Sequence, residues 1–275
     1  MYKLIFSDKL IYIELHKTGS TYTRNILSNI TSQEWQSKGK HNTYKDVFKD
    51  NIVDFQSKFK IGNIRNPWDW YVSLWAFGCM NKGAIYNRLA KKLNYSLFDN
   101  CLHTINLLLH NPNLFFMNRT NWRYLYSDAN DPILFRKWLN FILCQSDKKF
   151  GIDFHNSSFS KYYGLLTYRY LSLYTYNFNL EQDRMKSYND VISFDKKDNF
   201  LDLIIQTENI EETLLNNSKL VGSDRKEISS IIEKFKTKRN QSSHSSIEEY
   251  YTPETIDLVY RKEKFIIDKY DYKFI

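Results

Sequence analysis

The first residues that could do chemistry are polar and charged residues that follow a short apolar segment. Leu10–Leu15 has the length and composition of a buried strand, and His16–Thr21 directly after it reads HKTGST. Tyr22, Ile26 and Ile30 then recur at intervals of four residues, which predicts a helix. A strand, a glycine-containing turn and a helix bring backbone N–H groups and the positive end of the helix dipole to one place. This segment is therefore a candidate anion-binding loop.

The order of residues in this loop differs from that of a Walker A loop. Lys17 precedes the single glycine of the loop, Gly19, whereas the Walker A lysine follows the second of two glycines. The loop can still bind a phosphate through backbone N–H groups, one ammonium and the hydroxyls of Ser20 and Thr21. An ordinary polar turn between a strand and a helix has a similar composition, so this alternative stays open.

A second polar group ends another apolar run. Phe59–Ile64 predicts a buried strand, and Pro67 suits the first position of a following helix. Arg65 lies at the end of the strand, and Ser73 follows eight residues later, two turns into the helix. The donor fork of arginine fits a phosphate, and a serine hydroxyl adds a donor. A surface arginine and an ordinary helical serine are the alternative interpretation.

Together the two segments resemble the sulfotransferases that use 3′-phosphoadenosine 5′-phosphosulfate (PAPS), especially the carbohydrate and membrane-associated type and its bacterial relatives. In that family a KTG[ST]T-like loop binds the 5′-phosphosulfate, and a later Arg-Asn-Pro element with a serine binds the 3′-phosphate. Lys17–Thr21, Arg65–Pro67 and Ser73 match these motifs in order. Residues 202–214 and 250–260 also resemble C-terminal segments of the family.

The resemblance implies transfer of a sulfuryl group from PAPS to an acceptor hydroxyl by in-line displacement. Lys17 would stabilise the charge on the leaving nucleotide, and Thr18–Thr21 would hold the 5′-phosphate. Arg65 and Ser73 would bind the 3′-phosphate and so select this nucleotide over ATP or AMP. Arg239 is a further candidate for the 3′-phosphate. The scheme requires no metal.

The residue that removes the acceptor proton is less sharply defined. His41 lies between the two cofactor elements, where several relatives carry a catalytic His or Glu, and an imidazole titrates near neutrality. We therefore predict His41 as the base, with Glu14 as the acidic alternative. Glu208 stands beside the predicted helix cap Asn209 and is interpreted as structural. His16 occupies a position where the family often has proline, and it is either a further anion contact or a capping side chain.

The elements expected around these residues form an α/β domain. Strands followed by helices at 3–15, 59–77 and 201–220 predict a mainly parallel central sheet flanked by helices, and the resemblance makes the fold P-loop-like. We expect one domain, residues 1–275. Its middle, about 80–195, is rich in aromatic residues and corresponds to the variable acceptor-binding region of the family, expected as a helical insertion.

Capping residues and prolines mark further boundaries. Besides a first strand at Tyr2–Phe6, the sequence predicts helices at Thr43–Lys49 and Pro132–Cys144. Another helix begins after Asp224 and runs through Lys236, and the last begins at Pro253 after a Thr252 cap.

Composition limits the partners. The chain has 39 Lys and Arg against 31 Asp and Glu, a formal net charge of +8, which favours anionic partners. The basic residues are spread along the chain and no common nucleic-acid-binding motif is present, so we expect no nucleic acid. No apolar run approaches about 18 residues, and Ser7–Lys9 interrupts the N-terminal segment, so we expect no transmembrane segment and a cytoplasmic protein. The three cysteines are widely spaced, and we expect no zinc site.

The resemblance and the aromatic middle of the chain imply an acceptor hydroxyl on a carbohydrate or glycolipid. Three alternatives remain open at this point. These are a nucleic-acid-binding or polyanion-binding protein, a P-loop nucleotide kinase, and a silent relative that binds nucleotide without catalysis.

Overall fold

The computed structural model describes residues 4–32, 34–38, 48, 52–90, 122–144, 153–236 and 245–274. The strands are β1 (Leu4–Phe6), β2 (Leu10–Ile13), β3 (Gln36–Lys38), β4 (Phe59–Ile64) and β5 (Leu203–Gln206). The helices are α1 (Ser20–Leu27), α3 (Ile52–Ser57), α4 (Pro67–Cys79), α5 (Ala84–Leu89), α8 (Trp122–Leu125), α9 (Pro132–Cys144), α10 (Asp153–Asn156), α11 (Phe159–Tyr162), α12 (Leu165–Tyr174), α13 (Phe178–Glu181), α14 (Tyr188–Asp198), α15 (Ile210–Asn216), α16 (Arg225–Phe235), α17 (Ile247–Tyr250) and α18 (Pro253–Tyr270), with 3-10 turns at Gln182–Arg184 and Thr207–Asn209. Of the expected helix Thr43–Lys49, only Phe48 belongs to the described residues.

The chain has the predicted α/β class, but its sheet is mixed. The strand order is β3-β1-β2-β4-β5. The pairs β2–β4 and β4–β5 are parallel, whereas β1 pairs antiparallel with both β2 and β3. The turn between β1 and β2 is too short for a crossover, and the Ser7 hydroxyl accepts a bond from the Leu10 N–H across it (3.1 Å). The expectation of a mainly parallel sheet therefore holds only for β2, β4 and β5.

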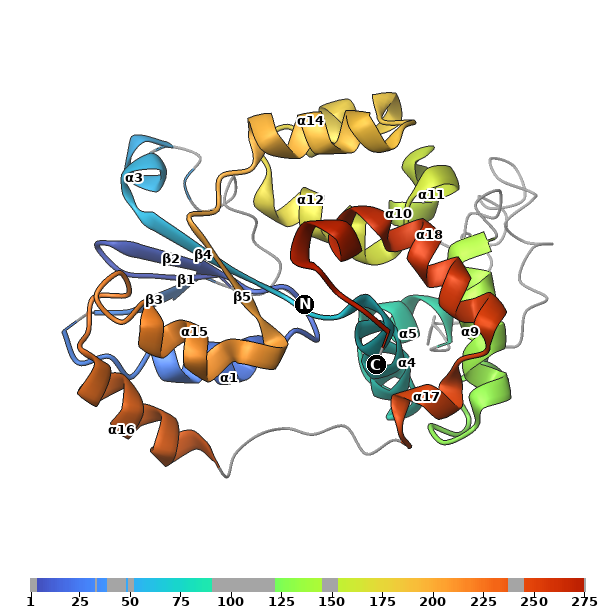
Figure 1. Ribbon diagram of the computed structural model, residues 1–275, viewed down its shortest axis with the longest axis horizontal. Helices are drawn as coiled ribbons and strands as arrows, with labels where there is room; N and C mark the ends of the chain where they lie inside the picture. The colour runs from blue at the N-terminus through green and yellow to red at the C-terminus, as the bar shows by residue number, and fades with distance from the viewer. Residues whose placement is uncertain are drawn as a thin grey trace, which may run out of the picture.

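Both faces of the sheet are covered. Successive residues of a strand point to opposite faces. Leu10 and Tyr12 accordingly pack into an apolar cluster with α1, α15 and α16, while Ile11 and Ile13 belong to the larger cluster on the other face. Figure 1 shows α1, α15 and α16 grouped together along the sheet. The strands β2 and β4 are short and almost wholly buried, and their ends carry the polar loops, whereas β3 is exposed at Gln36 and Ser37.

The described part of residues 80–195 is helical and aromatic, as predicted. Helices α9 and α12 from this region gather with α4 and α18 beside the sheet (Figure 1). The ring of Trp75 packs edge-on against Phe135 and Tyr250, with centroids 5.5 and 5.8 Å apart. No helix in the part of the chain that the structure describes is long and apolar enough to cross a membrane.

A buried carboxylate joins α18 to α12. Glu263, which is 0% exposed, accepts bonds from the Leu166 and Thr167 N–H groups (2.9 and 2.8 Å), the Thr167 hydroxyl (2.6 Å) and the Tyr71 hydroxyl. It therefore caps the start of α12 from another helix. A side chain at Gly164 would approach Glu263 Oε1 to 2.0 Å, which explains the glycine there.

Candidate functional site

The loop after β2 takes a backbone course that depends on its glycine. Lys17 and Gly19 both have a φ of 67°, in the left-handed region. Gly19 is the residue immediately before α1, and a Cβ there would come within 2.6 Å of Ile210 Cδ1 on α15. Glycine is required at this position both by its dihedral angle and by the approach of α15.

This course exposes three successive N–H groups of the loop. The backbone N–H groups of Gly19, Ser20 and Thr21 donate no hydrogen bond to any part of the chain that the structure describes. The buried Thr18 hydroxyl donates to the Leu15 carbonyl (2.7 Å) and holds the loop closed. Successive N–H groups next to left-handed residues, at a helix N-terminus, form an anion-binding concavity.

Lys17 places its charge beside this loop. Its Nζ lies 4.6 Å from the centre of the Phe77 ring on α4, in cation–π contact. Burial, and then the nearby Arg65 guanidinium, lower the pKa of Lys17 from 10.5 to about 8. The ammonium is thus partly desolvated, which strengthens its interaction with an anion.

Arg65 connects the two motifs. It lies directly after β4, and its guanidinium donates to the Lys17 carbonyl (3.1 Å) and, through Nε, to the Asp69 carboxylate (2.5 Å). Asp69 lies in the first turn of α4, four residues after Arg65, where an i, i+4 pair can form. Asp69 is a further member of the site, and its only signal in the sequence was its spacing of four residues from Arg65.

Ser73 lies on the α4 face that is directed at the loop. Asp69, Ser73 and Phe77 follow one another at intervals of four residues and therefore share that face. Asp69 contacts Arg65 and Phe77 contacts Lys17, so Ser73 lies between two residues of the site; it is 1% exposed. The structure thus brings Lys17, Arg65 and Ser73 into one neighbourhood.

A buried polar network that the sequence did not predict supports the loop from beneath. The Tyr12 hydroxyl donates to the Asn63 side-chain carbonyl, and Asn63 Nδ2 donates to the Thr23 hydroxyl (3.1 Å). The Ser20 carbonyl lies 3.3 Å from the Tyr12 hydroxyl. One available signal was Asn63, a polar residue inside a strand otherwise expected to be buried.

Two predicted site residues lie outside the described residues: the candidate base His41, and Arg239, the further candidate for the 3′-phosphate. The alternative base, Glu14, is described. Glu14 is 5% exposed and forms an ion pair with Arg24 on α1. Its carboxylate therefore holds α1 against the end of β2.

His16 and Glu208 are both held in place. The His16 ring lies 5.4 Å from the Phe77 ring, and the His16 carbonyl accepts a bond from Trp70 Nε1 (2.8 Å). Burial, followed by the charge of Arg169, holds the pKa of His16 well below its usual range. Glu208 accepts from the Asn66 N–H (2.8 Å) at the start of α4, and burial raises its pKa.

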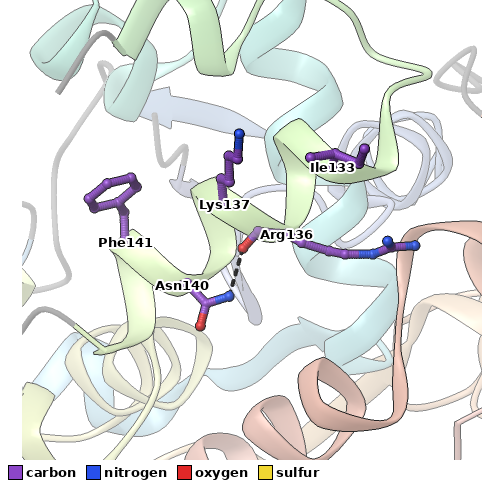
Figure 2. Close-up of a pocket in the computed structure, with 5 residues that line it drawn as sticks. All are labelled: Ile133, Arg136, Lys137, Asn140 and Phe141. Carbon is purple, nitrogen blue, oxygen red and sulfur yellow. Dashed lines mark hydrogen bonds between the residues drawn. The ribbon is translucent and has the colours of Figure 1, made fainter.

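A hollow of about 290 Å³ lies elsewhere, on α9. Figure 2 shows its lining residues, Ile133, Arg136, Lys137, Asn140 and Phe141, all projecting from this one helix. The Arg136 guanidinium donates to the Tyr250 and Glu249 carbonyls, and its own carbonyl accepts from Asn140. None of these residues belongs to the loop or to the surroundings of Arg65, so the hollow is not part of the candidate site.

Among the described residues, no group of three or more His, Cys, Asp or Glu side chains could hold a metal ion. Comparison of the chain with known protein families, with curated proteins and with solved structures finds no match.

Proposed function

We propose that the protein is a PAPS-dependent sulfotransferase. The observation that carries this proposal is the hydrogen bond from the Arg65 guanidinium to the Lys17 carbonyl. It brings two motifs 48 residues apart in sequence into one site, next to the N–H groups of Gly19–Thr21, which donate to no described residue. The resemblance of the same two motifs to the sulfotransferase family supports the same function.

The residues present fit a nucleotide with two separate anionic ends. The N–H groups of Gly19–Thr21 and the Lys17 ammonium suit the 5′-phosphosulfate. Arg65 and Ser73 suit the 3′-phosphate, because a guanidinium and a hydroxyl are both phosphate donors. Thr18 would contribute through its backbone, since its hydroxyl already donates to Leu15.

PAPS supplies the sulfuryl group when bound. The Lys17 ammonium would neutralise charge on the leaving phosphate oxygen, and its partial burial makes that interaction stronger. Asp69 would orient the Arg65 guanidinium. His41 remains the predicted acceptor of the proton from the hydroxyl, at its imidazole nitrogen.

The proposal also includes a P-loop-like arrangement of β2, the loop and α1. It further includes one domain spanning residues 1–275. It also includes an acceptor hydroxyl on a carbohydrate or glycolipid bound by the aromatic-rich helices of the middle region, and a cytoplasmic location. Arg239 remains a predicted contact to the 3′-phosphate.

Calorimetric titration with adenosine 3′,5′-bisphosphate and with 5′-AMP tests the cofactor site. We expect the bisphosphate to bind more tightly than 5′-AMP. The difference should correspond to one charge-assisted contact, about 1.5–3 kcal/mol or roughly ten- to a hundredfold in Kd. Arg65→Ala should remove this gap. Arg261→Ala, which removes the same charge from an exposed pair on α18, should leave it unchanged.

Equal binding of the two nucleotides, or no binding, would remove the support for this function. Tight ATP binding with phosphoryl transfer would favour a nucleotide kinase. Binding of nucleic acid that weakens steeply with salt, without any effect of Arg65→Ala, would favour a polyanion-binding protein.

A further inference from the structure

Arg169 on α12 differs from the other arginines that the structure describes. Every other described arginine donates a hydrogen bond to a carboxylate, a carbonyl or an amide oxygen, whereas no such bond from Arg169 is present within the described residues. Its guanidinium carbon instead lies 5.4 Å from the centre of the Trp70 ring, and the residue is half-buried. A guanidinium has five donors in a fixed fork, so this one retains capacity for a ligand.

Trp70 places Arg169 next to the anion-binding loop. The Trp70 indole donates to the His16 carbonyl (2.8 Å), and His16 directly precedes Lys17. The charge of Arg169 also contributes to the lowered pKa of His16. Arg169 therefore contacts α4 at Trp70, whereas Lys17 contacts the same helix at Phe77.

The charges of this neighbourhood do not balance. Lys17, Arg65 and Arg169 are cations. Asp69 binds Arg65, the Glu208 carboxyl also lies near Arg65, and no carboxylate among the described residues forms an ion pair with Arg169. Under the proposed function the two ends of the nucleotide occupy Lys17 and Arg65. A half-buried cation is disfavoured without a partner anion. Arg169 can therefore bind an anionic group other than the two ends of the nucleotide.

We propose that Arg169 is a specificity-determining residue that binds an acidic group on the acceptor, so that the acceptor is an acidic sugar bearing a carboxylate or a sulfate. This inference rests on the proposed sulfotransferase function. Arg169 comes from α12, in the aromatic-rich middle region, and not from either nucleotide motif. The guanidinium fork matches a carboxylate or sulfate with two parallel donors.

The test uses the full chain saturated with adenosine 3′,5′-bisphosphate, which fills the Lys17 and Arg65 sites. Two matched probes, p-nitrophenyl β-D-glucuronide and p-nitrophenyl β-D-glucoside, are then titrated by calorimetry. We expect the glucuronide to bind about tenfold more tightly, as one charge-assisted pair implies. Arg169→Gln should abolish this preference and Arg169→Lys should keep part of it, while Arg261→Gln should leave it intact. Thermal unfolding of each variant checks that it is folded.

The outcomes separate the two proposals. Failure of the bisphosphate to bind in the first titration contradicts the sulfotransferase function. Normal bisphosphate binding followed by equal or undetectable binding of the two glycosides, or by a preference that Arg169→Gln leaves unchanged, overturns the role of Arg169 alone. Weaker bisphosphate binding by Arg169→Gln would make Arg169 a nucleotide contact and would also overturn it.

Discussion

At the scale of single residues, Lys17 shows how the fold changes the chemistry of a side chain. Its Nζ is held over the Phe77 ring and near a second cation, and its pKa falls to about 8. An exposed lysine would stay protonated up to a pH far above the physiological range. Here the charge that is proposed to stabilise the leaving group exists only below a mildly alkaline pH.

Bisphosphate affinity should therefore fall as the pH rises through about 8, because the Lys17 ammonium loses its proton there. The sign follows from the lowered pKa, since the charged form predominates only below it. Calorimetric Kd values between about pH 6.5 and 9.5 check this. Lys17→Arg should bind with no such decline, because a guanidinium stays protonated throughout. A decline of equal size in Lys17→Arg would assign the titration to another group.

At the scale of elements, helix termini decide how the site is built. Asn66 caps α4 by accepting from the Trp68 N–H (3.1 Å), and Pro67 follows at the first helical position, as the sequence predicts. Asn209 does precede α15, but its side chain makes no capping bond. The start of α12 has no cap of its own and uses Glu263 from α18, which tethers the helix that carries Arg169.

Glu263→Gln should destabilise the protein. The amide nitrogen of glutamine would face N–H or O–H donors that, in the wild type, donate to a carboxyl oxygen of Glu263. Each buried partner left unsatisfied costs about 1–3 kcal/mol. Burial raises the pKa of Glu263, so its stabilising contribution is complete below the unfolded pKa and falls as the pH rises through the folded pKa.

The free-energy difference between the wild type and Glu263→Gln should accordingly be larger at pH 5 than at pH 7. Urea denaturation at both pH values measures it, with the exposed Glu248→Gln as the control for removal of a carboxylate. A larger difference at pH 7 would show that the folded protein lowers the pKa of Glu263.

At the scale of the whole molecule, the mixed sheet brings the two motifs together. The strands β2 and β4 are parallel neighbours, so the loop after β2 and Arg65 after β4 lie at the same edge of the sheet. Beneath that edge, Tyr12, Asn63 and Thr23 join β2, β4 and α1 through buried hydrogen bonds. The position of the loop relative to Arg65 depends on this contact among three elements.

Tyr12→Phe and Asn63→Leu should each lower the free energy of unfolding by about 1–3 kcal/mol, because each leaves a buried partner unsatisfied. The double variant should lose less than the sum, since both polar partners are then absent. Urea denaturation of the double-mutant cycle checks this, with the exposed Tyr124→Phe as the control. Additive losses would mean that the two side chains are not coupled.

Local patterns in the sequence determined the strands other than β3, the helices that follow them, and the first members of the site. Apolar runs and prolines located β4, α4 and α9, because strand length, the fixed φ of proline and helical periodicity are properties of nearby residues. Lys17 and Arg65 could be chosen for the same reason, since each stands at the end of a predicted strand.

Tertiary structure alone decided which residues meet. The antiparallel edge at β1 and β3, the Tyr12–Asn63–Thr23 network and the contact of Arg169 with Trp70 join segments that are far apart in sequence. Periodicity specifies which face of an element is buried but not the partner that covers it. The unbalanced cation on α12 became visible only once packing had placed it beside the loop.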